Sequence, residues 1–334
     1  MTTERSESVL KEVILSMADN LCNDDSHQLI NSLGDMVKSR PDLLCDKVVV
    51  SIIEMLSDPD SDVRQEAVNA FGAIANSRPD ILYQDIVDSI VNRSNDGSSD
   101  VRSASVMSLG EIALTRPDLI FEGIVHIVLK VILDESHNVR EKSADAIGKI
   151  VKSRPELIYA EVVDTIFNHI IDSDDGVRRK SAKSLGEIIL YRPDMIYEGV
   201  IDSVVERLND EDPDVREEFA NLIGKVAKSR PDLLNQGLFD SIINKYSSNY
   251  GKFQLGDADQ RQPTADSISE IARARSDLLD ETSVEIIIDE LHDSYSYIRA
   301  VALVSGSVII NSRPDLIQNN FVFAIIHMFS DPDI

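Results

Sequence analysis

The residues that could carry chemistry in this chain are six histidines, two cysteines and several pairs of neighbouring carboxylates. A zinc or iron site would need His, Cys and Glu at defined spacings, as in HExxH or CxxC, and neither motif occurs. None of the histidines has a Glu or Cys at the spacing that metal ligands require: His27, His126, His137, His169, His292 and His327. We therefore expect no metal ion and no other cofactor.

Motifs for phosphate binding and nucleophilic catalysis are also missing, since the sequence has no glycine-rich phosphate loop and no GxSxG elbow. Paired carboxylates such as Asp174-Asp175 or Glu217-Glu218 could act as acid and base. They stand where helices are expected to begin, and the helix dipole favours acids there. The sequence predicts a protein that is not an enzyme.

The charge balance excludes other classes of partner. With 33 basic and 59 acidic residues, the net charge of −26 disfavours nucleic acid and anionic membranes. No uninterrupted apolar stretch approaches ~18 residues, so we expect no membrane insertion. Cys22 and Cys45 fall near opposite ends of neighbouring helices, too far apart for a disulfide. A reducing compartment, the cytoplasm, fits this chain best.

The elements that position these residues follow from an internal repeat. The phrase Arg-Pro-Asp-Leu and its variants recur every 38 residues, with one interval of 45, at Arg40, Arg78, Arg116, Arg154, Arg192, Arg230, Arg275 and Arg313. A second phrase keeps step with it, with an Asp six residues before the Arg of Val-Arg or Ile-Arg. Its members are Asp58 and Arg64, Asp96 and Arg102, Asp134 and Arg140, Asp172 and Arg178, Asp210 and Arg216, and Asp293 and Arg299.

Each repeat has the pattern of two helices. After Arg64, apolar or small residues recur at helical spacing, which predicts the second helix of the repeat, helix B: Ala67, Val68, Phe71, Ile74 and Ala75. The first helix, helix A, is expected directly after each proline, as in 81–91 or 157–171. A pair of short helices cannot bury its apolar face alone, so successive pairs must stack into a solenoid.

These features resemble HEAT repeats, in a form similar to those of adaptin and condensin subunits, where a DPxxxVRxxA…PDL run is familiar. The resemblance implies an all-α fold, a right-handed α-α superhelix of about eight two-helix repeats of 38 residues plus a terminal helix. Helices A would lie outside and helices B would line the concave side. It also implies that the Asp and Arg of the second phrase form a hydrogen-bonded ladder between neighbouring repeats.

The whole chain, 1–334, is expected to be one solenoid. We divide it into a capping repeat at about 6–40, regular repeats over 41–230, a repeat with a seven-residue insertion over 231–275, a last repeat over 276–313 and a terminal helix over 314–334. The first repeat departs from the pattern, and so does the seventh, which has Leu255, Ser269 and Ser276 in place of Asp, Gly and Pro.

The resemblance is specific for fold and open for function. The favoured interpretation is a non-catalytic scaffold or adaptor that holds a partner protein or peptide on its concave face. One alternative is a structural subunit of a larger trafficking or chromosome-organising complex. The other is an enzyme of HEAT fold, lyase-like or glycosylase-like, although glycosylases of this kind use a basic groove with aromatic residues, which this acidic chain supplies poorly.

Three features could form a partner site. Outward positions of the helices B opened by Arg140, Arg178 and Arg216 carry eight basic residues against five acidic ones, and could receive an acidic segment: Lys142, Lys149, Lys152, Arg179, Lys180, Lys183, Lys225 and Lys228. The alternative is that these lysines, near the C-terminal ends of helices, interact favourably with the helix dipole and balance the charge of nearby acids. The second feature is the last helix B, apolar nearly all round at Val301, Val304 and Val308. A partner, a second copy of the chain or the inserted loop could cover it, and the alternative is that these valines are simply exposed.

The third feature is the insertion, which contains two glycines and interleaved aromatic residues, among them Tyr250, Lys252 and Phe253. It could form a protruding recognition loop, because loops on rigid scaffolds often carry function. A helix A longer by two turns accounts for the same seven residues equally well.

Overall fold

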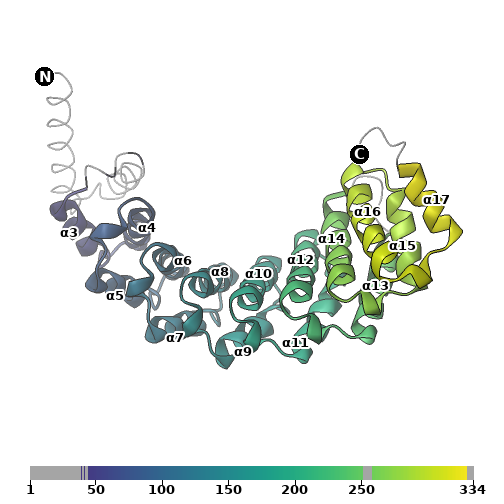
Figure 1. Ribbon diagram of the computed structural model, residues 1–334. Coiled ribbons are helices and arrows are strands. Elements are labelled where there is room, and N and C mark those ends of the chain that lie inside the picture. The colour runs from purple at the N-terminus through teal and green to yellow at the C-terminus, as the bar shows by residue number, and fades with distance from the viewer. Residues whose placement is uncertain (1–38, 40, 42–43, 251–257, 329–334) are drawn as a thin grey trace, which may run out of the picture. The chain divides into compact units, whose positions relative to one another are not determined.

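The computed structural model describes residues 39, 41, 44–250 and 258–328, and the described residues form α-helices and short 3-10 helices without a strand (Figure 1). The chain divides into two compact units, residues 1–166 and 167–334. The all-helical class predicted from the periodicity is confirmed. Most of the expected capping repeat at 6–40 lies outside the described residues, as do Cys22, Lys252, Phe253 and Leu255.

In the first unit, two rows of helices pack against each other (Figure 1). Helices A form one row: α3 (Asp46–Met55), α5 (Gln84–Arg93) and α7 (Glu122–Val131). Helices B form the other, in which each packs on the next: α4 (Ser61–Ser77), α6 (Ser99–Thr115) and α8 (His137–Ser153). The boundary between the units falls within the next helix A, α9 (Ala160–His169).

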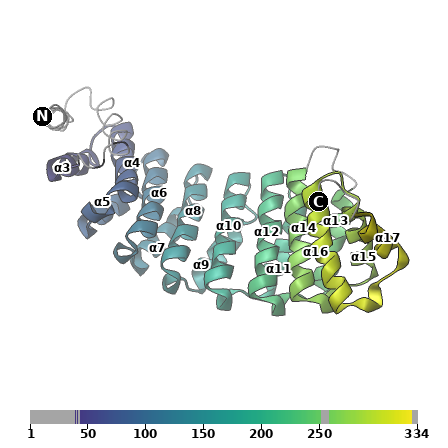
Figure 2. The ribbon, with the colours of Figure 1, turned by 45° about the horizontal axis from the view of Figure 1, so that its top comes forward.

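The second unit repeats the arrangement. Its helices B lie side by side in Figures 1 and 2: α10 (Asp175–Tyr191), α12 (Pro213–Ser229), α14 (Ala258–Ala274) and α16 (Ser296–Ser312). Its helices A are α11 (Glu198–Glu206), α13 (Gln236–Tyr250), α15 (Glu281–Leu291) and α17 (Asn319–Met328). The last of these is the terminal helix expected within 314–334.

The periodic residues of helix B form the core between the rows. All five apolar positions predicted after Arg64, from Ala67 to Ala75, have 0% exposure. Eight residues after the opening Arg stands a glycine, and a Cβ at Gly110 would lie 3.1 Å from the Cα of Ala146 in the next helix B. The glycine therefore lets neighbouring helices B approach closely, which brings their outer side chains within reach of one another.

Helices A begin later than the sequence analysis predicts. The prolines open short 3-10 helices, such as Pro79–Ile81 and Pro155–Leu157, and the α-helices start at Gln84 and Ala160. Proline sets its own φ and lacks an N–H, which suits a first turn. Leu82 then becomes extended, with ψ of 134°, and this interrupts the helix before α5 begins. The start predicted directly after each proline is therefore wrong by about three residues.

Candidate functional site

The turn between helices A and B is tied to the next repeat by the arginine that opens helix B. Arg64 donates from Nε and Nη2 to the two carboxylate oxygens of Asp96, at 2.8 and 2.7 Å. We call this row of bonds the A–B turn ladder. The same bidentate pair is formed by Arg102 and Asp134 in the first unit and by Arg178 and Asp210 in the second.

The same arginines also close their own turns. Arg64 donates from Nη1 to the carbonyl oxygens of Asp58 and Pro59, at 2.8 and 3.0 Å. The carboxylate of Asp58 accepts from the backbone N–H of Asp60 at 2.8 Å. Corresponding bonds to the turn are made by Arg140, Arg216 and Arg299, which donate to the carbonyls of Asp134, Asp210 and Asp293, and by Asp172 and Asp293, which accept from the N–H groups of Asp174 and Tyr295.

The ladder changes the acidity of its carboxylates. Burial of Asp96, whose side chain is 4% exposed, would by itself raise the pKa of that carboxyl. Hydrogen bonds from Arg64 and from the backbone of Ser98, with the charges of Arg64 and Arg93, outweigh burial, so the pKa of Asp96 is lowered. Asp134 has a lowered pKa for the same reasons, with Arg102 as its main partner.

A second ladder, which the sequence analysis missed, joins the turns between helix B and the next helix A. Arg116 donates from Nη1 to the carbonyl oxygens of Pro79 and Leu82 in the preceding repeat, at 2.9 and 2.6 Å. Its Nε and Nη2 bind Asp118, two residues later, at 2.9 and 2.7 Å. We call this the B–A turn ladder. It recurs at Arg154, Arg230, Arg275 and Arg313.

The predicted basic surface is distributed over both units. In the first unit, Lys149 lies half-buried and its Nζ is 2.8 Å from both Glu111 and Asp145. Burial would lower the pKa of Lys149, but hydrogen bonds to Asp145 and Glu111 outweigh it and raise the pKa. Lys142 is 3.4 Å from its neighbour Glu141, and Lys152 is exposed near the end of α8.

In the second unit, Lys225 repeats the arrangement of Lys149. Its side chain crosses Gly186 and ends 3.6 Å from Glu187, which is 7% exposed. Lys228 is 3.3 Å from Glu270, and Arg179 is 3.1 Å from Asp214. Lys180 lies half-buried on α10.

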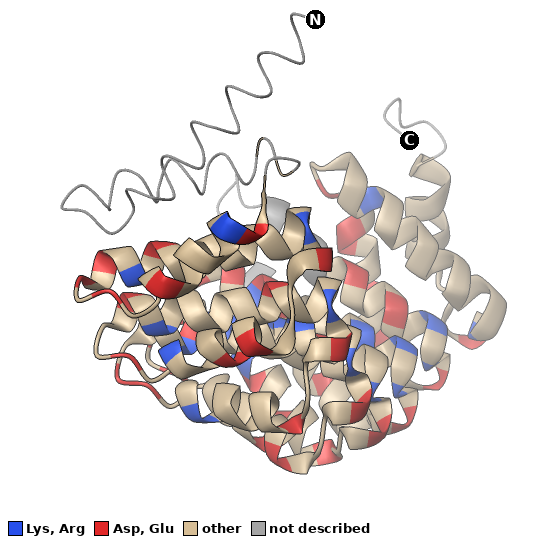
Figure 3. Cartoon of the chain, turned by 90° about the vertical axis from the view of Figure 1, so that its left-hand side faces the viewer, with Lys and Arg blue, Asp and Glu red and all other residues tan. Residues whose placement is uncertain are grey.

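Ion pairs between neighbouring helices B therefore explain much of the predicted basic surface. Nine residues after the opening Arg, successive repeats alternate in charge: Glu111, Lys149, Glu187, Lys225 and Glu270. Figure 3 likewise shows acidic and basic residues interspersed along helices and turns. The alternation can be found in the sequence by comparing the residue at this position in each helix B with that in the next helix B.

An open cleft lies on the helices B of the second unit, between α10, α12 and α14. Its volume is about 480 Å³, and its lining residues are Lys183, Glu218, Asn221, Gly224, Lys225, Lys228, Asp266, Ser267 and Glu270. Three of the predicted basic residues thus face three carboxylates. Burial raises the pKa of Asp266, against the effect of the hydrogen bond that Tyr297 donates to it at 3.1 Å. The cleft offers charges of both signs on helices that pack against one another.

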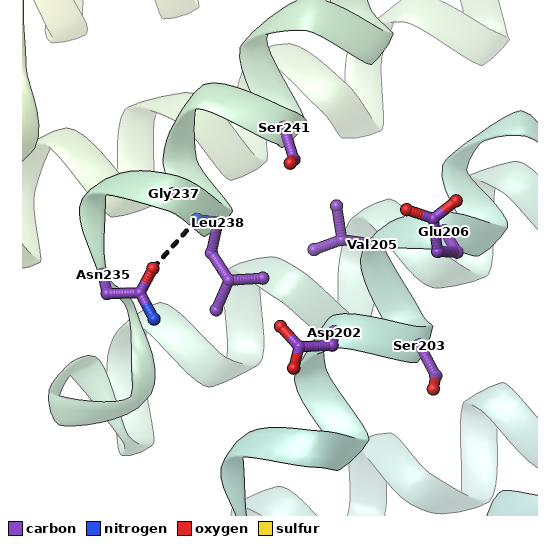
Figure 4. A pocket seen from close by; sticks show the side chains of 8 residues that line it. All are labelled: Asp202, Ser203, Val205, Glu206, Asn235, Gly237, Leu238 and Ser241. Atoms are coloured by element: carbon purple, nitrogen blue, oxygen red, sulfur yellow. Dashed lines mark hydrogen bonds between the residues drawn. The ribbon is translucent and has the colours of Figure 1, made fainter.

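A second pocket of about 460 Å³ lies between the helices A α11 and α13 (Figure 4). Val205 and Leu238 contribute apolar surface, while Asp202 and Glu206 stand one helical turn apart on α11. At its edge the side chain of Asn235 accepts from the backbone N–H of Leu238 at 3.0 Å. No signal for this pocket was recognised in the sequence.

The other predicted features have mixed outcomes. Val301, Val304 and Val308 lie half-buried on α16, and Phe323 and Ile326 of α17 are more exposed, at 71% and 55%. The assignment of Tyr250 to a loop is wrong, because it is the last residue of α13. That helix has 15 residues where α5 and α7 have 10, so part of the insertion lengthens helix A.

Two further observations concern only the described part of the chain. Residues 44–250 and 258–328 contain no group of three or more His, Cys, Asp or Glu side chains placed to hold a metal ion. Among the helices described, none is both long enough and apolar enough to span a bilayer.

Comparisons with known structures support the fold. Kap95p, in a structure with RanGDP, superposes with a TM-score of 0.70 at 15% identity, over 100% of this chain and 46% of that one. Importin beta gives 0.69 at 13% identity, over 99% and 51%. An engineered protein gives 0.63 at 18% identity, over 94% and 81%. The chain therefore spans about half the length of the two transport proteins, and the likeness shows the fold alone.

The comparison with protein families is more specific, whereas no curated protein matches the sequence significantly. The model of the family described as sister chromatid cohesion protein PDS5 matches residues 9–192 and again residues 126–237. The two matches overlap, as a 38-residue repeat permits, and the first alone covers more than half of the sequence. The chain belongs to the PDS5 family of HEAT-like repeat proteins.

Proposed function

We propose that this chain is a non-catalytic scaffold that holds a partner protein or peptide in the cleft on α10, α12 and α14. The observation that carries the proposal is the cleft itself, about 480 Å³ of open space lined by three cations and three carboxylates on packed helices. The B–A turn ladder ties these repeats together through Arg230 and Arg275, and a surface that is held in place before binding reduces the entropy lost on binding.

The partner chemistry follows from which cations are exposed at the cleft. Lys225 lies beside Glu187 and its side chain is 26% exposed. The Lys228 side chain is 60% exposed although it is 3.3 Å from Glu270, and Lys183 is exposed at the cleft. An acidic segment of the partner would bind Lys183 and Lys228, which narrows the acidic-partner hypothesis to these two lysines. Kap121p, a protein of similar fold at 12% identity and a TM-score of 0.64, was crystallised with the extreme C-terminus of the phosphatase Cdc14p. A protein of similar fold thus binds the C-terminal end of a partner protein.

The cytoplasm remains the proposed location. Cys45 is an exposed free thiol, and such thiols persist in a reducing compartment.

Affinity purification of the tagged chain from its native cells, with quantitative mass spectrometry, tests the scaffold. We expect a partner at near-stoichiometric amount, and Lys183→Glu with Lys228→Glu should reduce its recovery at least about tenfold, the effect of ~1.4 kcal/mol. Lys130→Glu, at an exposed lysine of α7, is the matched control and should leave recovery unchanged. Equal recovery with the double variant and the control would contradict the proposed cleft.

A second candidate, a structural subunit of a chromosome-organising complex, is favoured by the family match, because the family is named for sister chromatid cohesion. In that case the purified material should be enriched in chromosome-associated proteins, and the isolated chain should self-associate or precipitate in size-exclusion chromatography with light scattering. A clean monomer that recovers only unrelated cytoplasmic partners would favour the adaptor.

A further inference from the structure

Aromatic residues occupy one structural position in four consecutive repeats. The position is five residues after the arginine of each Arg-Pro-Asp-Leu phrase, and it holds Tyr83, Phe121, Tyr159 and Tyr197. The chain has no Trp, only 8 Tyr and 9 Phe, so this is a marked concentration. Three of the four are 46–48% exposed, namely Tyr83, Phe121 and Tyr197.

Helix stability does not explain aromatic residues here. Tyr83 and Phe121 are the N-cap residues of α5 and α7, with extended backbone and no side-chain capping bond. An N-cap normally carries Asn, Asp, Ser or Thr, and loss of such a cap costs about 1 kcal/mol. The corresponding position later in the chain has these residues: Asn235 accepts from the N–H of Leu238, and Asp280 accepts from that of Ser283. The aromatic repeats therefore lack a stabilising cap that their neighbours have.

The backbone that carries the row is held firmly. Arg116 donates to the carbonyl of Leu82, the residue directly before Tyr83, at 2.6 Å. Arg154 donates to the carbonyl of Ile120, directly before Phe121, at 2.8 Å. The B–A turn ladder thus fixes Tyr83 and Phe121 to the repeats that follow them.

The ring of Phe121 has a defined resting place. It leans over Gly123, where a Cβ would lie only 2.9 Å from its Cε2 atom, so the ring covers the glycine and about half of the side chain remains in solvent. A side chain of this kind offers an aromatic face without needing to unfold.

Carboxylates surround the row in the first unit. Asp85, Glu122 and Glu161 stand in the first turns of α5, α7 and α9. Burial first, and then the negative charges of Glu161 and Glu122, raise the pKa of Tyr159, so carboxylates from two successive helices A act on one ring. Aromatic faces beside carboxylates attract ammonium and guanidinium groups, and the net charge of −26 draws cations toward the chain.

We propose that Tyr83, Phe121 and Tyr159, with their neighbouring carboxylates, form a docking surface for an extended basic segment of a partner protein. Stacked helices lie ~9–10 Å apart, and three residues of a polyproline II segment span about 9.3 Å. The fitting segment therefore carries Lys or Arg at every third residue. This surface shares no residue with the cleft and takes a partner of the opposite charge.

Fluorescence anisotropy with the full chain tests the proposal. The probe is a labelled peptide of about twelve residues with Arg at every third position and Pro between, long enough to span three repeats. Two comparison peptides are used. One has the same composition with its arginines consecutive, and the other has Gln in place of each Arg. We expect the spaced arginine peptide to bind most tightly, and binding to weaken with added salt.

The decisive variant combines Tyr83→Asn, Phe121→Asn and Tyr159→Asn. It supplies the cap residue found at Asn235, so thermal unfolding should occur at an unchanged or higher temperature, while peptide affinity falls at least about tenfold. Tyr191→Asn, at a 47% exposed tyrosine outside the row, is the matched control and should bind like the parent. Glu122→Gln with Glu161→Gln, which leaves the rings intact, should also weaken binding.

Three results would overturn the docking surface: parental affinity in the triple Asn variant, equal binding of the consecutive-arginine or glutamine peptide, or no binding of the spaced peptide. Because the peptide is basic and the cleft variants change lysines, loss of the cleft function leaves this test unaffected.

Discussion

The two turn ladders hold the same repeats at opposite ends of their helices, but they use different acceptors. In the A–B turn ladder, Arg102 binds the carboxylate of Asp134, so both partners must be specific residues. In the B–A turn ladder, Arg116 binds the backbone carbonyls of Pro79 and Leu82, which any residue can supply. The second ladder should therefore tolerate sequence change that breaks the first.

The seventh repeat illustrates this difference. Ser276 replaces the proline there, yet residues Ser276–Leu278 still form the 3-10 helix. Arg275 still donates to the carbonyls of Pro231 and Leu234, and Arg313 donates to that of Ser276 at 3.4 Å. The turn aspartate is replaced in the same repeat by Leu255, a residue type that cannot accept from an arginine. The backbone acceptors therefore keep the B–A joint although serine replaces proline at Ser276.

The largest effect is expected from Arg102→Ala. The substitution removes the bonds to Asp134 and leaves a carboxylate that is 12% exposed without its cation. We expect a loss of about 3 kcal/mol in the free energy of unfolding, because removing one member of a largely buried ion pair is strongly destabilising. Urea unfolding followed by circular dichroism measures it, and a loss below ~1 kcal/mol would contradict the importance of the A–B turn ladder.

Arg116→Ala should cost less, about 2 kcal/mol, because the carbonyls it leaves can regain water more easily than a buried charge. The matched contrast is Asp118→Asn, which removes the partner carboxylate, 61% exposed, but keeps the bonds to the carbonyls. That change should cost under ~0.5 kcal/mol, as exposed ion pairs do. If Asp118→Asn proved as damaging as Arg116→Ala, the carboxylate and not the backbone would be the essential acceptor.

The smallest expected effect is a change in how the stability of the A–B turn ladder depends on pH. The pKa of Asp134 is lowered in the folded chain, so its stabilising contribution is complete above the pKa of the unfolded chain and is lost as pH falls through the folded pKa. Asp134→Asn removes that contribution, and the variant should lose less stability than the parent between neutral and acid pH. Parallel pH profiles from urea unfolding would show that Asp134 does not contribute in this way.

The repeat and its helices could be predicted because each helix B must bury one face. The buried residues of that face, such as Phe71 and Ile74, therefore recur in the sequence at helical spacing. The Asp and Arg of the A–B turn ladder recur in the sequence, and their bonding between repeats was implied by the resemblance to HEAT repeats. The B–A turn ladder was missed because its acceptors are carbonyls of Pro79 and Leu82, which no residue type reveals. The acid two residues after each arginine, as at Asp118, was the available signal.

The candidate site was predicted less well for a different reason. Helical offsets correctly place Lys149 and Lys225 away from the core, but they do not show what a neighbouring helix contributes. Glu111 and Glu187 come from the repeats before, and they pair with Lys149 and Lys225. The length of α13 could not be decided, since seven residues suit both a loop and two added turns.

Hydrogen exchange of the Arg102→Ala variant tests most directly the claim that each pair of neighbouring repeats is stabilised by its own contacts. In a quasi-one-dimensional array, amides of α6 and α8 should exchange faster than in the parent, while those of α16 keep their protection. Uniform loss of protection from α4 to α16 would contradict the claim and indicate a single cooperative core.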